Sequence, residues 1–454
     1  MFTIVVLGFA SEELFIFLLG CAIFFTALCL ALPLSGRAIA GERAAFLMAG
    51  LVIWVFLMVS ESIFSHSQST ASAAKGHVDP SALYQALSWI LSFAALVFVT
   101  CFRPAYLRRL FAGPLKWASI FAIVAVLSCP LSPKPMYSAA LAFKLCLIVL
   151  TLCAMGEAIE DEIGIRRLFA GIFLGTLVIV TKAFIAPLLE IDTIFNGGGR
   201  LPMVGLSGAA GALLLLCLLF LFLKKNLLFL MLAIYSVVVI MVAGNKGGMV
   251  ASLVSLMMFF ILLKRPAQAL AVSFGFGIVL ALAIAFTPLG HSLEKYGQEG
   301  NAGTLTGRTN LWAEAWPKMK AHLILGNGYR ASRFLSEEVP GAFQEAGNMH
   351  NSFLEILYNN GLAGLIPILL INVLIVVNLK DVILRPPTLQ LRYYAAAALA
   401  LNVHLFVWGL VAVTFGGAPD DRFMTFFAIL LISMFLRGQS DRKYWKTVYF
   451  EGSN

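Results

Sequence analysis

The sequence predicts an all-α polytopic membrane protein with twelve or thirteen transmembrane helices and one large polar loop. Hydrophobic residues make up 60% of the 454 positions and charged residues only 12%, against about 25% charged in an average soluble domain. Apolar runs of about 18–25 residues recur from end to end, which is the length needed to cross about 30 Å of hydrocarbon. We therefore expect residues 1–454 to form a single integral membrane domain, interrupted by the loop at 289–350.

The helices are expected wherever an apolar run is long enough to span the bilayer. The predicted spans are 12–33, 44–64, 82–102, 115–129, 138–156, 168–189, 206–223, 227–243, 248–263, 267–288, 351–378, 393–415 and 422–436. Basic residues are concentrated in every second connection, which the positive-inside rule places in the cytoplasm. This predicts an external N-terminus, an internal C-terminus and an external 289–350 loop. A count of twelve, with a re-entrant first segment, remains an alternative.

The formal net charge of +9 does not indicate a nucleic-acid partner. The basic residues are scattered in twos and threes between spans, as charges that set membrane topology are. The seven cysteines lie in or beside apolar runs without paired spacing, so they predict small core residues rather than disulfides or a metal site.

Two short external connections carry cations that topology does not explain. Arg200 follows three glycines in Asn196–Gly205, and backbone N–H groups of such a turn, with the bidentate guanidinium, can bind phosphate oxygens. Lys246, in Gly244-Asn-Lys246-Gly-Gly248, is a second candidate phosphate contact. The alternatives are a flexible turn with a snorkelling arginine and an ordinary interfacial lysine.

The 289–350 loop carries six basic and six acidic residues, which indicates a folded polar element. We expect a helix capped by Thr306, with Arg308 in its first turn and Trp312 on the same face. Pro317 predicts a kink or an early end. The apolar face of this helix is expected to lie along the membrane surface, where tryptophan is common.

His350 stands at the start of the next apolar helix. The positive end of a helix dipole disfavours imidazolium, so the ring is expected to be neutral and able to accept a proton. A fixed cation, Arg308, and a proton acceptor at one membrane face favour chemistry on a lipid-linked phosphate. A purely structural histidine is the alternative. Three further polar residues inside spans, for which the sequence indicates no role, are Lys144, Lys182 and His404.

These motifs resemble the O-antigen ligase and O-antigen or exopolysaccharide polymerase superfamily. The resemblance rests on Gly307-Arg308-Thr-Asn-Leu311-Trp312, the Gly326-Asn-Gly328 turn, and His350-Asn351-Ser-Phe-Leu354-Glu355 running into Gly361-Leu-Ala-Gly364. Arg200 with Gly205 is similar to an upstream arginine–glycine element of the family. Lys246 replaces an arginine of the family pattern, so it keeps the charge and loses the planar fork.

The resemblance implies a GT-C-like, inverting glycosyltransferase without cofactor or catalytic metal, in the bacterial inner membrane with its site facing the periplasm. The donor would be an undecaprenyl-pyrophosphate-linked glycan and the acceptor another glycan or lipid A-core, with a chain-length regulator as a possible partner. In this interpretation His350 and Arg308 are catalytic, and Arg200, Arg308 and Lys246 bind pyrophosphate. Trp312, Asn351 and Glu355 are expected to support them.

Two choices remain open at this level. The exopolysaccharide polymerase is slightly favoured over the ligase, because the matches around Arg200 and Lys246 are weak. A transporter or flippase for lipid-linked oligosaccharides is a rival class, since Lys144, Lys182 and His404 would suit a polar pathway. The absence of visible sequence repeats counts against a transporter.

Overall fold

The computed structural model describes residues 39–64, 80–102, 104–159, 161–189, 205–243, 245–286, 308–335 and 348–446. Every regular element in these ranges is helical. The α-helices are α2 (Ile39–Phe64), α4 (Pro80–Phe102), α5 (Leu115–Ser128), α6 (Pro135–Ala158), α7 (Glu162–Leu189), α9 (Leu206–Lys224), α10 (Leu227–Ala243), α11 (Lys246–Leu262), α12 (Pro266–Phe286), α14 (Arg308–Ala321), α16 (Ser352–Leu384), α17 (Leu389–Gly409) and α18 (Asp421–Lys446). Short 3₁₀ segments are η2 (Pro104–Phe111), η3 (Cys129–Leu131) and η4 (Ala331–Phe334).

The predicted all-α polytopic fold class is confirmed. Each predicted span from 44–64 onward overlaps one of these helices, although α17 ends at Gly409, before the end of the predicted 393–415 span. The predicted span at 12–33 lies outside the described residues. By length and composition, five of the helices in the described ranges can cross a membrane, and six shorter apolar helices accompany them. The five are Pro135–Glu157, Glu162–Ile185, Leu206–Lys224, Ser352–Leu384 and Asp421–Asp441.

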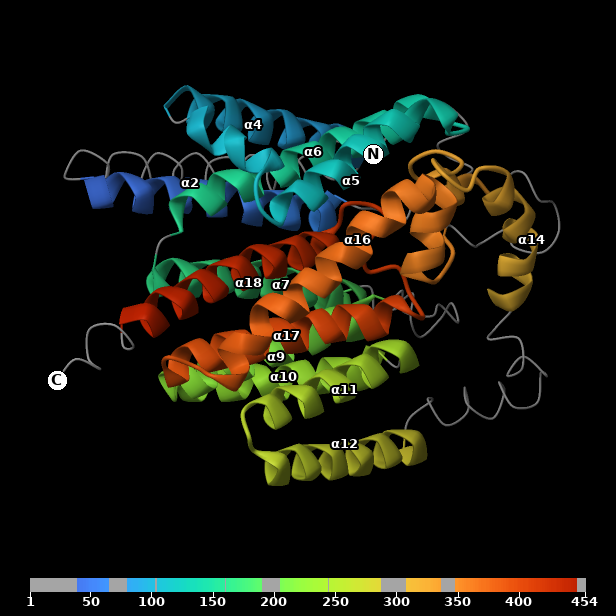
Figure 1. The fold of residues 1–454 in the computed structure, drawn as a ribbon. Coiled ribbons are helices and arrows are strands. Elements are labelled where there is room, and N and C mark those ends of the chain that lie inside the picture. Colours follow the sequence, from blue (N-terminus) through green and yellow to red (C-terminus); the bar gives the residue numbers. More distant parts are fainter. Residues whose placement is uncertain are drawn as a thin grey trace, which may run out of the picture.

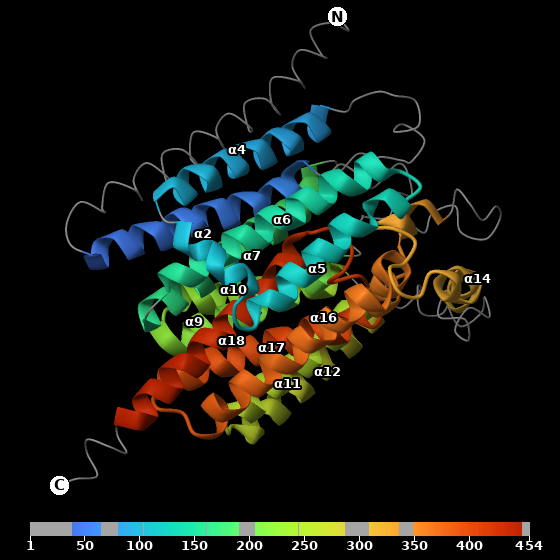
Figure 2. The same ribbon diagram turned by 45° about the horizontal axis from the view of Figure 1, so that its top comes forward.

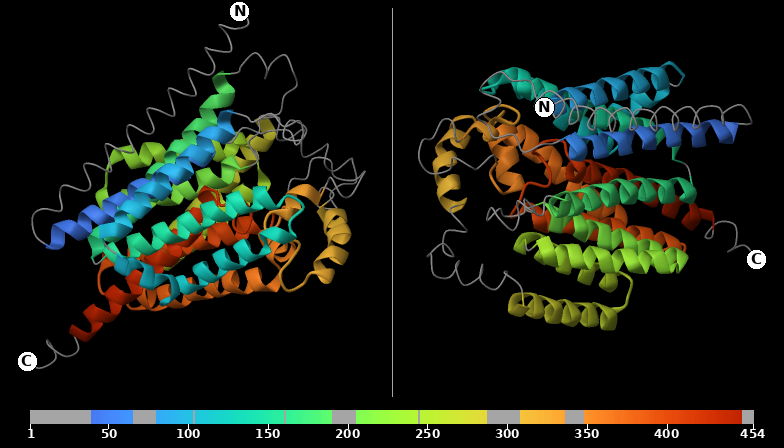
Figure 3. Two further views of the ribbon diagram at one scale, coloured as in Figure 1. Left: turned by 90° about the horizontal axis from the view of Figure 1, so that it is seen from above. Right: turned by 180° about the vertical axis from the view of Figure 1, so that it is seen from behind.

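Most helices run side by side, and α14 lies across one end of them (Figures 1 and 2). Helix α16 packs against α5, α17 and α18, and α17 packs against α9 and α11. Helix α12 packs against α11 and stands at the edge of the bundle, as the view from behind shows (Figure 3). Because α9 and α11 begin, and α17 ends, at the end that carries α14, one end of the bundle collects the connections that were predicted to be external (Figure 1).

Helix α14 differs from the sequence expectation in two respects. Pro317 lies inside the helix, which continues to Ala321, so of the two expected effects of the proline the early end is wrong. The apolar face, with Leu311, Ala315 and Met319, packs against Ala331, Leu335, Met349 and Tyr358 of the protein, where a membrane surface was expected. Thr306, the expected N-cap residue of this helix, lies outside the described residues.

Helix α16 is opened at Gly361, which has φ 60° and ψ −160°, a conformation available almost only to glycine. The opened backbone is satisfied by the turn after α14. The Asn327 and Gly328 N–H groups donate to the carbonyls of Tyr358 and Asn359 at 2.8 and 3.0 Å. The Leu362 and Ala363 N–H groups in turn donate to the carbonyls of residues 323 and 324, at 2.8 and 3.0 Å. The turn is therefore fixed to the N-terminal third of α16.

Gly361→Ala is predicted to destabilise the protein by more than about 1 kcal/mol, because alanine cannot adopt this backbone conformation without strain. The added Cβ would also lie 2.3 Å from the Ile324 carbonyl oxygen. Thermal unfolding in detergent, followed by fluorescence, measures the effect. Gly438→Ala in α18 is the matched control, since no atom of the described residues lies within 4 Å of its new methyl group. Equal melting temperatures for the two variants would contradict the role of Gly361.

Candidate functional site

His350 lies immediately before α16, at the end of the bundle that carries α14. Asn351 caps this helix: its side-chain oxygen accepts hydrogen bonds from the N–H groups of Phe353 (2.9 Å) and Leu354 (3.1 Å). The Asn351 amide also donates to the Leu410 carbonyl at 3.0 Å, so the cap is tied to the end of α17. His350 itself has φ +50°, and non-glycine residues with positive φ often mark functional sites.

Arg308 begins α14 and reaches the same place from a different segment. Its Nη1 donates to the Val411 carbonyl at 2.8 Å, one residue beyond the carbonyl that holds Asn351. One turn later, the Trp312 indole N–H donates to the Met349 carbonyl at 2.8 Å. Arg308 and Trp312 were predicted to share one face of this helix. Through these two hydrogen bonds that face holds α14 against Met349 and against the connection between α17 and α18.

Burial and the nearby Arg308 both favour the neutral form of the His350 imidazole. Burial lowers the pKa of His350 below its usual value, and the positive charge of Arg308 lowers it further. The sequence interpretation of a neutral histidine at this helix start is consistent with that direction. A neutral imidazole that is half-buried beside a fixed cation can accept a proton near neutral pH.

Glu355 holds the backbone around this pair. Its carboxylate is fully buried and accepts hydrogen bonds from the Met349 N–H (2.9 Å) and the Ser332 hydroxyl (2.6 Å). It also forms a buried ion pair with Arg330 at 3.1 Å and accepts from the Asn359 amide at 3.1 Å. One buried carboxylate therefore joins η4, the first turns of α16 and the residue that precedes His350.

Of the other two predicted phosphate contacts, the structure describes Lys246 but not Arg200. Lys246 is the first residue of α11 and is exposed, and its neighbour Gly247 packs so closely on Val411 that an added Cβ would lie 2.5 Å from the valine side chain. The backbone of α11 is thus brought against the residue whose carbonyl holds Arg308. Arg200 lies outside the described residues. Gly205 ends the connection that contains Arg200. A Cβ added to Gly205 would lie 3.9 Å from Nη1 of Arg422.

Sequence reasoning missed the connection between α17 and α18 as part of this site. Val411 and Leu410 supply the carbonyls that hold Arg308 and Asn351. Arg422 lies 5.3 Å above the Trp408 ring, and its Nε donates to Asp420 at 2.8 Å. The available signal was the Gly416-Gly-Ala-Pro-Asp-Asp-Arg422 tract, a polar segment on the predicted external face.

His404 lies inside the bundle and contacts two neighbouring helices. It is fully buried in α17, where Nε2 lies 2.8 Å from the Gly208 carbonyl of α9 and Nδ1 lies 3.4 Å from the Ser255 hydroxyl of α11. Lys144 is also fully buried, with its ammonium 5.7 Å from the Trp89 ring centre. The His404 contacts join three helices.

The fold and the site define a multi-pass membrane protein with a polar site at one end of a helical bundle. Residues 231–369 match the Wzy_C family model, described as O-antigen ligase. The match confirms the resemblance to the O-antigen ligase and polymerase superfamily, and it includes Lys246, Arg308 and His350. It supports a membrane enzyme of the ligase or polymerase type that uses a lipid-linked glycan and an acceptor. No curated protein matches the chain.

The buried carboxylate gives a first test of the site's framework. Glu355→Gln is predicted to destabilise the protein by about 3 kcal/mol, because the Arg330 charge is left buried without its counter-charge. Glu157→Gln is the matched control: its partner Arg109 lies 2.7 Å away, but both side chains are partly exposed, and such pairs contribute less than about 1 kcal/mol. Comparable losses in thermal unfolding for the two variants would argue against the framework role.

The lowered pKa of His350 gives a second test. Neutral imidazole reacts with diethyl pyrocarbonate, so modification of His350 should persist below the ordinary histidine pKa of about 6.5. Arg308→Gln removes one of the two causes, and the modification midpoint should move to higher pH while remaining below 6.5 because burial remains. Peptide mass spectrometry at each pH measures the midpoint, and the exposed His322 in the same digest reports the reagent's activity. An unchanged midpoint would contradict the coupling.

Proposed function

We propose that this protein is an inverting membrane glycosyltransferase that transfers a glycan from undecaprenyl pyrophosphate to an acceptor hydroxyl. The observation that carries the proposal is the meeting of Arg308 and His350, which approach from separate segments at one end of the bundle and interact electrostatically. We infer that this end faces the periplasm of a bacterial inner membrane, in agreement with the positive-inside assignment.

In the proposed reaction His350 takes the proton of the acceptor hydroxyl as the oxygen attacks the anomeric carbon. The bond from that carbon to the pyrophosphate oxygen breaks on the opposite face, and undecaprenyl pyrophosphate leaves with the bonding electrons. Negative charge develops on the leaving group, and fixed cations aimed at it stabilise the transition state. Arg308 supplies this charge, with Arg200 and Lys246 as further pyrophosphate contacts, so the proposed reaction uses protein cations and no metal.

The supporting residues act on geometry in this proposal. Asn351 fixes the start of α16, Trp312 fixes α14 against Met349, and Glu355 fixes Met349 itself. A displacement of about 1 Å in such a site can lower a rate about 100-fold. We favour a polymerase of exopolysaccharide or O-antigen repeats slightly over a ligase that transfers the glycan to lipid A-core. A chain-length regulator is an expected partner of the polymerase.

Complementation of a deletion strain tests the proposal. His350→Ala is predicted to lower transfer about 10²–10⁴-fold by removing the general base, and Arg308→Ala about 10²–10³-fold by removing charge stabilisation. Arg308→Lys should also be poor, because an ammonium does not reproduce bidentate binding. The measurement is the pool of undecaprenyl-linked glycans, with membrane protein levels determined in parallel. Full rescue by His350→Ala would overturn its assignment as the base.

The same measurement separates the candidate activities. Single undecaprenyl-linked repeats that accumulate on the periplasmic face indicate a polymerase. Long undecaprenyl-linked polymer, together with bare lipid A-core, indicates a ligase. Repeats trapped at the cytoplasmic face would contradict a transferase and favour a transporter.

A further inference from the structure

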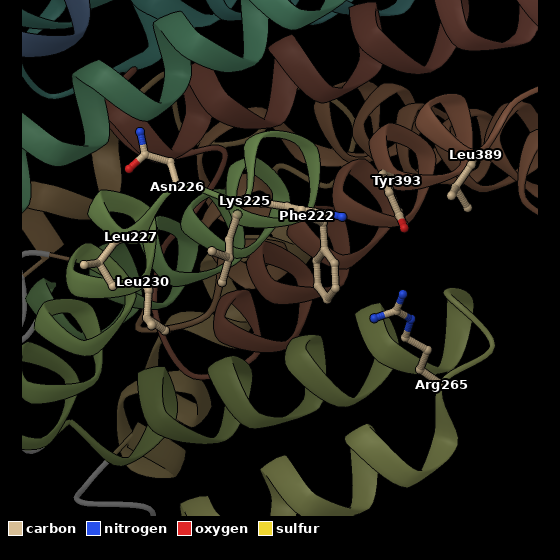
Figure 4. Close-up of a pocket in the computed structure, with 9 residues that line it drawn as sticks. Phe222, Lys225, Asn226, Leu227, Leu230, Arg265, Leu389 and Tyr393 are labelled. Atoms are coloured by element: carbon tan, nitrogen blue, oxygen red, sulfur yellow. The ribbon is translucent and has the colours of Figure 1, made fainter.

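A second feature lies at the opposite end of the bundle from His350, where α9 ends and α10, α12 and α17 begin. It is a partly open pocket of about 680 Å³ (Figure 4). Its lining residues are Leu221, Phe222, Lys225, Asn226, Leu227, Leu230, Arg265, Leu389 and Tyr393. Two cations and a tyrosine therefore share one pocket with a predominantly aliphatic wall.

The charge of this pocket has one sign. The Arg265 guanidinium lies 4.9 Å from the Phe222 ring centre, and its Nη1 reaches the Gln268 side chain at 3.4 Å. Arg392, in the adjacent first turn of α17, donates twice to the Leu262 carbonyl, at 2.9 and 3.1 Å. The sequence contains no Asp or Glu between residues 193 and 293 or between 382 and 419, the segments that supply every lining residue. An anion is the complementary ligand.

The helices beside the pocket also expose large apolar side chains. On α10, Leu227 of the pocket wall and Met231, one turn further along, are 67% and 61% exposed. On α12, which begins directly after Arg265, Leu270 and Phe274 are 69% and 73% exposed. In a membrane protein, such faces contact acyl chains. A ligand with an anionic head and apolar chains matches this combination, whereas a soluble anion would leave the aliphatic wall and these exposed faces unused.

We propose that this pocket binds the headgroup of an anionic phospholipid, whose chains extend along the exposed faces of α10 and α12. Lys225 and Arg265 contact the phosphate, and the Tyr393 hydroxyl donates to the headgroup. Basic pockets between transmembrane helices on the cytoplasmic side commonly bind anionic lipids, and the basic connections predict that this end is cytoplasmic. The proposal does not depend on the transfer reaction, because none of its residues belongs to the candidate site.

Native mass spectrometry of the full chain in detergent tests the proposal, with phosphatidylglycerol and phosphatidylethanolamine added at equal concentrations. Phosphatidylglycerol should remain bound preferentially. Lys225→Asn and Arg265→Gln should each weaken its binding about fivefold. Asparagine is chosen because Lys225 has φ +50°, a conformation that asparagine tolerates.

Lys264→Asn is the matched control. Lys264 also has positive φ, 58°, and adjoins Arg265, but it does not line the pocket. If Lys264→Asn weakens binding as much as Lys225→Asn, or if both lipids bind equally, the basic residues act only as diffuse topogenic charge and the proposal is wrong. Displacement of phosphatidylglycerol by inorganic phosphate or ATP would also overturn it, since the pocket would then recognise a soluble anion.

Discussion

The opened backbone of α16 at Gly361 is the constraint on which the rest of the site depends. A helix interrupted within a bundle exposes N–H and carbonyl groups that have no water to bind them, so other backbone must satisfy them. Residues 323–328, in the turn after α14, do this with two pairs of hydrogen bonds: the N–H groups of Asn327 and Gly328 donate to α16 before Gly361, and the carbonyls of residues 323 and 324 accept from α16 after it. The turn is anchored on its far side as well, because the Ser138 hydroxyl donates to the Tyr329 carbonyl and the Tyr329 hydroxyl donates to the Gly417 carbonyl.

This docking explains why a buried ion pair is found next to the proposed base. Once the turn is fixed to α16, the chain that follows places Arg330 against Glu355, and the remaining acceptor positions of Glu355 bind η4 and Met349. Removal of one partner would be costly, because an unpaired buried charge has no solvation. Through the hydrogen bond from Met349 to Glu355, the ion pair fixes the backbone next to His350 relative to the turn.

The sequence predicted the helices because apolar run length is a direct consequence of bilayer thickness, and each span from 44–64 onward corresponds to a helix. It also predicted that His350 precedes a helix, because an apolar run begins directly after it; the Asn351 cap that fixes this start was found only in the structure. It could not predict that Val411 and Leu410 would hold Arg308 and Asn351, since a backbone carbonyl carries no signature in the residue type. The direction of the apolar face of α14 was wrong for a related reason: Leu311 and Met319 fit a membrane surface and a protein surface equally well.

Three of the described arginines at this end of the bundle have different hydrogen-bond partners. Arg330 is buried against Glu355, and Arg422 contacts Asp420, so each has a carboxylate that offsets its charge. The hydrogen bond from Arg308 to Val411 is made to a neutral carbonyl, which orients the guanidinium without changing its charge. The effect of that charge extends to His350, whose pKa it lowers. Arg330 is therefore a residue of the framework, whereas Arg308, which acts on His350, is the arginine that the proposed function assigns to the anionic substrate.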